Sequence, residues 1–404
     1  MSGTVQRFFA AALTPVLLFG CASQPVSIQQ TPAAAPQPSA ATANTNLSIE
    51  QMLEQMTLQK KVGQLFMVRP DALDLSLTQE QIDDEYADGV TQLTDAMRET
   101  LKTYPVGGIC QFGKNITDPQ QIAAFNAELQ EASSVPLLIA VDEEGGSVAR
   151  LANHPAFDLP QYESALAVGA TGEPEMARKM GQTIGAYLRQ YGFTMDFAPD
   201  ADVWTNPNNT VIGTRAFSQD ADTAALMAGA MARGLQEEAI LPTFKHFPGH
   251  GDTAEDSHSG LAYTYQSKEE MQLCEFIPFV QPSVGMYAVM VGHIAAPALD
   301  ASEKPASLSY SVVTELLREE LLPDEEILVV TDSFAMGAIT AQYTPGEAAV
   351  QALQAGCDLL LMPESLTEAF EAVEAAVRDG TIPEARLDES VARILRFKQQ
   401  YAGL

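Results

Sequence analysis

The sequence predicts an α/β protein whose folded part is a single (β/α)8 barrel of the TIM type. Three observations lead to this fold. Eight short apolar runs recur along residues 47–404, helical patterns lie between them, and polar side chains directly follow most of the runs. Short runs that are apolar on both faces are typical of parallel strands covered on both sides. In such barrels the active site lies at the carboxyl ends of the strands.

The runs are separated by about 30–55 residues, the length of a strand–helix unit with its loops. They occupy residues 65–68, 108–112, 136–141, 195–198, 242–244, 287–291, 327–330 and 358–362. Amphipathic helices are predicted at 119–133, 174–191 and 222–238, with a closing helix at 387–401. An open doubly wound sheet is the alternative, which the lack of a Gly-x-Gly-x-x-Gly after the first run weakens.

The composition is that of a globular protein with an acidic surface. Hydrophobic residues make up 46% of the 404 residues and charged residues 19%, which is ample for a large core. Twenty-two basic and 53 acidic side chains give a formal net charge of −31. This charge argues against nucleic acid or an anionic membrane surface as a partner.

The first 46 residues are expected to lie outside the catalytic domain, residues 47–404. Residues 1–20 combine an early Arg7 with an apolar stretch too short to span a membrane, as in a signal peptide. The stretch ends in Leu-Phe-Gly-Cys and resembles a bacterial lipoprotein box, so Cys21 is the predicted lipidation site, with plain secretion as the alternative. Residues 21–46, rich in Pro, Ala, Gln and Thr, are predicted to form a disordered tether. We therefore expect an exported lipoprotein, at the cell surface or in the periplasm of a bacterium, that contacts membrane only through its anchor.

The other three cysteines are odd in number and each lies in or beside an apolar stretch. We therefore predict that Cys110, Cys274 and Cys357 are buried thiols rather than disulfides or metal ligands. The segment 71–98 is acidic and poor in large hydrophobic residues, and it is expected at the surface without an assigned role.

Chemically active side chains follow the apolar runs, where a barrel would gather them at one face. They are Arg69, Asp142, Asp200, Asp202, Lys245, His246, His293 and Asp332. Asp332 is a candidate catalytic carboxylate, with an N-cap of the next helix as the alternative. Asp142 begins a turn with two glycines that lets a ligand approach the backbone, although a simple tight turn is also possible.

Three of the five histidines lie between residues 244 and 260, a segment suited to a catalytic loop. A histidine with pKa near 6.5 is about a quarter protonated at pH 7, whereas an ordinary glutamic acid is almost fully ionised. Asp256 lies two residues from His258 and would favour its protonated form, so His258 is a candidate general acid. A zinc site at His246 and His250 is disfavoured because Pro248 breaks a helix between them and Lys245 adds positive charge. A Ser–His–Asp hydrolase is disfavoured because the sequence has no Gly-x-Ser-x-Gly elbow.

The loop sequence resembles the signature of glycoside hydrolase family 3, and within it the exo-β-N-acetylglucosaminidase (β-hexosaminidase) branch. The matching stretch is Lys245-His246-Phe247-Pro248-Gly249-His250-Gly251-Asp252-Thr253, followed by Asp256-Ser257-His258. Further matching blocks are Asp142-Glu143-Glu144-Gly145-Gly146, Asp196-Phe197-Ala198-Pro199 and residues 206–217. The chain departs from the branch at Glu143 and Ser147, where Gln and Arg are common, and at Ser333, where many members have Asp.

The resemblance implies a role for each matching residue. Asp332 would be the nucleophile that forms a glycosyl-enzyme intermediate, and His258, partnered by Asp256, the acid and base. The residues implied to hold the terminal sugar are Asp142, Arg150, Arg215, Lys245 and His246. No cofactor or metal is implied.

The implied function is retaining hydrolysis of non-reducing terminal β-linked N-acetylglucosamine, from peptidoglycan fragments or chito-oligosaccharides. Alternatives are a phosphorylase acting on β-N-acetylglucosaminides, a β-glucosidase of the same fold, and a non-catalytic sugar-binding surface lipoprotein.

Overall fold

A computed structural model of the chain describes residues 47–404, except for 85, 255–259 and 281–283. The predicted signal peptide, tether and lipidation site Cys21 lie outside the described residues, as do Asp256 and His258 of the predicted acid and base.

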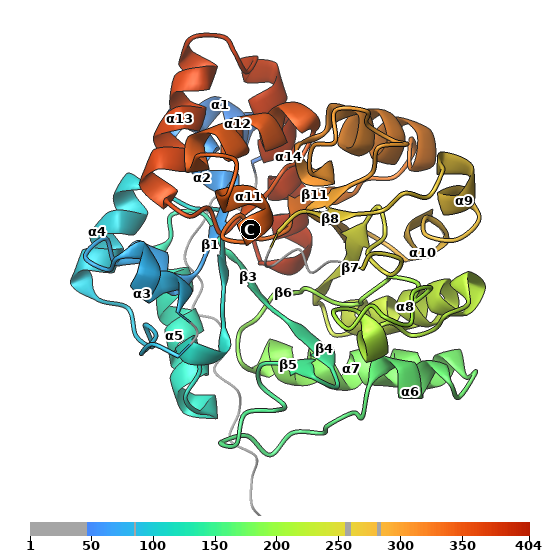
Figure 1. Cartoon of the computed structure of the whole chain (residues 1–404). Coiled ribbons are helices and arrows are strands. Elements are labelled where there is room, and N and C mark those ends of the chain that lie inside the picture. Colours follow the sequence, from blue (N-terminus) through green and yellow to red (C-terminus); the bar gives the residue numbers. More distant parts are fainter. Residues whose placement is uncertain (1–46, 85, 255–259, 281–283) are drawn as a thin grey trace, which may run out of the picture. The chain divides into compact units, whose positions relative to one another are not determined.

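Residues 47–404 contain a closed barrel of eight parallel strands surrounded by helices (Figure 1). The hydrogen-bonded order is β11-β9-β7-β6-β3-β2-β1-β12, and a parallel bridge between Val330 and Leu359 closes the ring. The predicted fold class is therefore confirmed. The strands are β1 Phe66–Val68, β2 Gly108–Cys110, β3 Leu138–Val141, β6 Met195–Asp196, β7 Leu241–Phe247, β9 Ala288–Val291, β11 Leu328–Thr331 and β12 Leu360–Leu361.

Each predicted apolar run overlaps one barrel strand, but β7 is longer than predicted. The apolar pattern ends at Phe244, whereas the ladder continues through a bridge from Lys245 to Asp200 and through the pair Phe247–Val291. Lys245 and His246 therefore belong to the strand itself rather than to the loop after it. A rigid strand, and not a loop, positions these two side chains.

Four predicted helices are present at nearly the predicted places. They are α5 Pro119–Ala132, α7 Pro174–Gln190, α8 Ala221–Glu237 and α14 Glu384–Tyr401. Helices α7 and α8 pack closely, because Gly181 and Gly234 leave room for the opposite backbone. A Cβ atom at either glycine would lie 2.1 Å from a carbonyl oxygen of the partner helix.

The remaining elements connect or cover this ring. The helices are α1 Ile49–Gln55, α2 Leu58–Gln64, α3 Gln79–Asp83, α4 Asp95–Thr103, α6 Ala165–Gly169, α9 Lys268–Gln272, α10 Ile277–Val280, α11 Gly337–Thr340, α12 Pro345–Ala355 and α13 Leu366–Arg378. Short 3-10 helices are η1 Pro70–Leu73, η2 Gly113–Asn115, η3 Gly213–Arg215 and η4 Ala306–Leu308, and η5 Ser311–Leu321 is a π-helix. Two small sheets pair β4 Glu143–Gly145 with β5 Val148–Ala149, and β8 Ala262–Tyr263 with β10 Ile294–Ala295.

The segment 71–98 is not the simple surface excursion that its composition suggested. Asp71 is buried, and its carboxylate accepts hydrogen bonds from Asn115 Nδ2 at 2.7 Å and from the Val90 amide at 3.1 Å. Lys114 Nζ donates to the carbonyl oxygens of Gln81, Ile82 and Asp84. The end of α3 is thus fastened to the barrel, although α3 itself has no buried residue.

The three described cysteines are free thiols, and two of them are buried as predicted. Burial raises the pKa of the Cys357 thiol to about 12, so it stays protonated at neutral pH. The prediction was wrong for Cys274, which is only half-buried because it follows the short exposed helix α9. Within the described part of the chain, every helix is too short or too polar to span a bilayer.

Candidate active site

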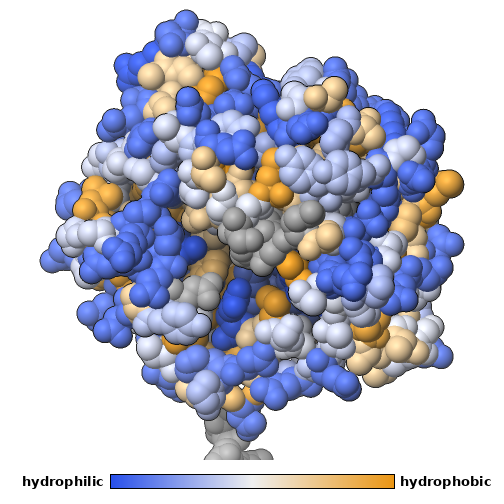
Figure 2. Space-filling model, in the orientation of Figure 1, coloured by the Kyte–Doolittle hydropathy of each residue, from blue (hydrophilic) through white to orange (hydrophobic). Residues whose placement is uncertain are grey.

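A pocket of about 330 Å³ opens at the carboxyl ends of the barrel strands. Figure 2 shows a hollow in this face with hydrophilic residues inside it and hydrophobic residues at its edge. Seven residues predicted from sequence line this one pocket: Arg69, Asp142, Arg150, Arg215, Lys245, His246 and Asp332. Catalytic groups in a barrel are expected at this end of the strands.

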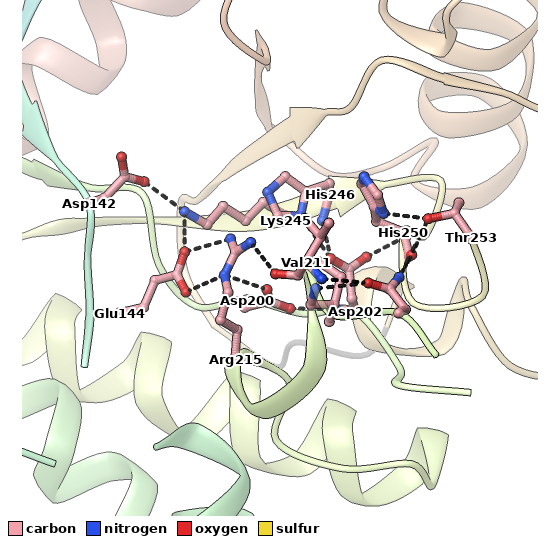
Figure 3. A network of polar contacts seen from close by, with 12 residues as sticks. Asp142, Glu144, Asp200, Asp202, Val211, Arg215, Lys245, His246, His250 and Thr253 are labelled. Atoms are coloured by element: carbon pink, nitrogen blue, oxygen red, sulfur yellow. Dashed lines mark hydrogen bonds and ion pairs between the residues drawn. The ribbon is translucent and has the colours of Figure 1, made fainter. Parts of the chain in front are cut away.

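Lys245 lies at the centre of an ionic network (Figure 3). Its Nζ is 2.7 Å from Asp142 Oδ1 and 2.6 Å from Glu144 Oε1. Arg215 donates to both Glu144 oxygens, from Nε at 2.9 Å and from Nη2 at 2.8 Å. Burial opposes ionisation of Glu144, but Arg215 and Lys245 outweigh it and hold the pKa of this carboxyl well below its usual range. The pocket wall therefore carries fixed charges of both signs, which suit the hydroxyl groups of a sugar.

Asp142 and Arg150 lie at the two ends of the hairpin formed by β4 and β5. The buried carboxylate of Glu143 stabilises this hairpin. Glu143 accepts from the amides of Leu151 and Ala152, at 2.9 and 2.8 Å, and from the Tyr187 hydroxyl at 2.8 Å. Burial raises its pKa. Glu143 and the exposed Ser147, where the chain departs from the family branch, are both absent from the pocket lining.

A second network orients His246. Its Nδ1 is 2.7 Å from Asp202 Oδ2, and the other Asp202 oxygen accepts from the His250 amide at 2.7 Å. Burial opposes protonation of His246, but the Asp202 carboxylate outweighs it and raises the pKa of the ring. Burial lowers the pKa of His250, whose Nδ1 pairs with Thr253 Oγ1 at 2.7 Å.

Asp200, Asp202 and His246 bring three possible metal-ligand atoms within 4.8 Å of one another. The Arg215 guanidinium lies 3.5 Å from Asp200 Oδ2, and N–H groups occupy both oxygens of Asp202. A cation would be repelled by Arg215 and would have to displace these donors. We therefore interpret the three residues as a positioning network.

Asp332 follows β11 and lines the pocket. Its amide donates to Val291 O at 2.9 Å, and its Oδ1 accepts from the Ser333 amide at 2.7 Å. The N-cap of the next helix is Met336, so the alternative N-cap function of Asp332 does not hold. His293 lies behind this turn, where its Nε2 is 2.9 Å from Ser333 O.

Sequence reasoning assigned no role to several residues that line the pocket. Glu144 could have been found, because it stands two residues after Asp142 and alternate residues of an extended chain share one side. Phe112 follows β2, and its ring lies 4.6 Å from the Arg69 guanidinium and 5.5 Å from that of Arg150. Asp83 reaches the pocket from α3, and no sequence pattern marks it.

The barrel, with carboxylates and cations gathered at the carboxyl ends of its strands, has the architecture of an enzyme that acts at this face. Residues 57–397 match the Glycosyl hydrolase family 3 N terminal domain, and the chain belongs to this family.

Among its relatives, beta-hexosaminidase A of Pseudoalteromonas piscicida is 32% identical over 340 residues, which cover 76% of this chain and 56% of that protein. Beta-hexosaminidase LpqI of Mycobacterium tuberculosis is 35% identical over an alignment that covers 78% of this chain and 81% of the LpqI chain. The family 3 β-N-acetylglucosaminidase of Paenibacillus sp. str. FPU-7 superposes with a TM-score of 0.76 at 38% identity. That superposition covers 85% of this chain and 62% of the Paenibacillus chain. The chain thus spans little more than half the length of the Pseudoalteromonas relative.

Proposed function

We propose that this protein is a retaining exo-β-N-acetylglucosaminidase that removes non-reducing terminal N-acetylglucosamine from peptidoglycan fragments or chito-oligosaccharides. One observation carries the proposal. Asp332 shares a pocket with Asp142, Arg150, Arg215, Lys245 and His246 on a family 3 barrel. The names of the hexosaminidase relatives support the choice of sugar.

In this mechanism the Asp332 carboxylate attacks the anomeric carbon and the glycosidic bond breaks, which leaves a covalent glycosyl ester. His258 gives its proton to the leaving oxygen and then takes one from the attacking water. Lys245, Asp142 and His246 hold the sugar hydroxyls, and Asp202 fixes the His246 ring.

An aryl β-N-acetylglucosaminide assay tests the activity, with the aryl β-glucoside for comparison and with phosphate present or absent. We expect free N-acetylglucosamine under all conditions and little glucose. Release of sugar 1-phosphate would instead identify a phosphorylase, and faster release of glucose a β-glucosidase. Asp332→Asn should abolish turnover. When the wild-type protein reacts with a slow fluorinated substrate, mass spectrometry should find the mass of the sugar added to the peptide that contains Asp332. His258→Ala should slow poor leaving groups much more than activated ones, and equal losses would exclude its role as the acid.

We also propose that the chain is exported and lipid-anchored at Cys21, on the strength of its N-terminal sequence. Growth with a labelled fatty acid should label the wild-type protein and leave Cys21→Ser unlabelled. Equal labelling of both would contradict the anchor.

A further inference from the structure

Helix α3 of the segment 71–98 is fixed in place by polar contacts and not by packing. None of its residues is buried. Lys114 donates to three carbonyl oxygens at its end, and Arg69 Nη1 donates to Ile82 O at 2.7 Å. Both cations are largely buried, with 5% and 11% of their side chains exposed. Because α3 adds nothing to the core, its fixed position serves the pocket beside it.

Asp83, the last residue of α3, reaches the active-site pocket. It is the residue of segment 71–98, within the described part of the chain, that lines this pocket. One carboxylate oxygen, Oδ2, accepts from Gln79 Nε2 at 2.7 Å. The other, Oδ1, is buried, lies 3.6 Å from Arg69 Nη1 and accepts no hydrogen bond from the described residues. A buried acceptor without a donor is costly, so a ligand that supplies the donor is favoured.

The guanidinium group of Arg69, which follows β1, is fixed before any ligand binds. Its Nε donates to Met362 Sδ at 3.2 Å and its Nη1 to Ile82 O. The group also lies 4.6 Å from the centroid of the Phe112 ring. Arg69 and Asp83 both line the pocket, and together they offer a donor and an acceptor at one place.

The geometry of this pair selects a hydroxyl group as its ligand. A separation of 3.6 Å is too long for a hydrogen bond, but an oxygen about 2.8 Å from both atoms fits between them. A hydroxyl can donate to the carboxylate and accept from the guanidinium at once. The N–H and C=O of a trans acetamido group point in opposite directions, so they cannot meet two atoms this close together. A charged substituent would be attracted by one member of the pair and repelled by the other.

The pair lies across the barrel mouth from Lys245. In the ring of strands, β7 with Lys245 is followed by β6, β3, β2 and then β1 with Arg69, which is half of the eight-stranded circle. A sugar ring held by Lys245 at one edge therefore presents a different edge to Arg69 and Asp83. Side chains often rotate when a ligand binds, and a small rotation of Asp83 turns Oδ1 toward that edge.

We propose that Asp83 and Arg69 form a specificity site that binds one hydroxyl group of the terminal sugar, on the edge away from Lys245. The hydroxyl donates to Asp83 Oδ1 and accepts from Arg69 Nη1. The proposal rests on the proposed glycosidase activity and deepens it, because it gives the segment 71–98 a part in the choice of substrate.

Aryl N-acetylglucosaminides that lack the hydroxyl on C3, C4 or C6 test the proposal. Wild type should discriminate against the analogue that lacks the bound hydroxyl by about tenfold or more in kcat/KM. In Asp83→Ala, parent and analogue should differ by less than about twofold at that position alone, and Arg69→Met should act at the same position. Asp83→Asn keeps one acceptor oxygen and should retain part of the discrimination. Asp84→Asn, at the exposed neighbour outside the pocket lining, is the matched control and should equal wild type at all three positions.

Each readout is a ratio between two substrates of one preparation, so a partly unfolded variant does not distort it. Two outcomes would overturn the inference: Asp83→Ala with the same discrimination as wild type at every position, or an equal fall at all three. A changed ratio between aryl N-acetylglucosaminide and aryl glucoside in Asp83→Ala would place the acetamido group at the pair and would also refute the hydroxyl assignment. Failure of the proposed activity is distinguishable, because wild type would then not cleave the parent substrate. Calorimetric titration with N-acetylglucosamine and its deoxy forms still tests the pair in that case.

Discussion

His246 Nδ1 lies 2.7 Å from Asp202 Oδ2, and this contact fixes which ring nitrogen is available to a ligand. Because Nδ1 is occupied by the carboxylate, Nε2 is the nitrogen left to contact a sugar hydroxyl. The buried Asp202 thus acts on the pocket through a residue of the neighbouring strand.

Asp202→Asn should therefore lower kcat/KM by about ten- to a hundredfold, as when the orienting partner of a functional histidine is lost. The pKa of His246 should fall, because the charge that raises it is gone. Titration of the imidazole resonances by NMR checks this shift directly. An unchanged midpoint for His246 would show that Asp202 does not control its protonation.

Glu144→Gln should destabilise the fold by about 3 kcal/mol, because Lys245 and Arg215 then share a buried site without their common carboxylate. Urea denaturation measures this change. The control is Glu237→Gln, which removes a surface partner of Arg178 and should have little effect. Similar losses in the two variants would mean that the Glu144 network contributes no more than a surface ion pair.

Lys114→Met should loosen the part of the pocket wall that contains Asp83. Lys114 binds three carbonyl oxygens at the end of α3, and its loss should lower kcat/KM for the aryl substrate by about fivefold, or about 1 kcal/mol, mainly through KM. Lys102→Met, at an exposed lysine paired with Glu99, is the control. Unchanged KM in Lys114→Met would place α3 outside the binding site.

Glu275→Gln should stabilise the protein at pH 8 and not at pH 5. Burial raises the pKa of Glu275 from 4.5 to about 8, so between these values the folded state holds a proton that the unfolded state has lost. Stability of the wild type therefore falls as pH rises through this window, and the variant lacks this loss. Thermal unfolding at both pH values, with exposed Glu269→Gln as the control, measures the difference. If the difference in Tm between Glu275→Gln and wild type is the same at pH 8 as at pH 5, the raised pKa of Glu275 is contradicted.

The barrel could be predicted from sequence because its strands are apolar on both faces and each repeats the same local pattern. The residues at strand ends followed from the same pattern, and five of those eight line one pocket: Arg69, Asp142, Lys245, His246 and Asp332. The position of Asp83 at the pocket could not be predicted from sequence. It depends on contacts that Lys114 and Arg69 make with an irregular segment that has no hydrophobic periodicity. The full length of β7 could not be predicted either, because it depends on a backbone bridge between Lys245 and Asp200, two residues far apart in the sequence. The roles of Asp256 and His258 stay predictions, because both lie outside the described residues.

The pairing of Phe66 with Leu360 and of Met67 with Leu361 joins the first barrel strand to the last. In the same way Arg69 Nε reaches Met362 Sδ at 3.2 Å across the finished seam. Contacts so distant in sequence form late in folding. The pocket at the carboxyl ends of the strands is therefore complete only after β12 has been synthesised and has paired with β1, although most of its lining residues precede β12 in the chain.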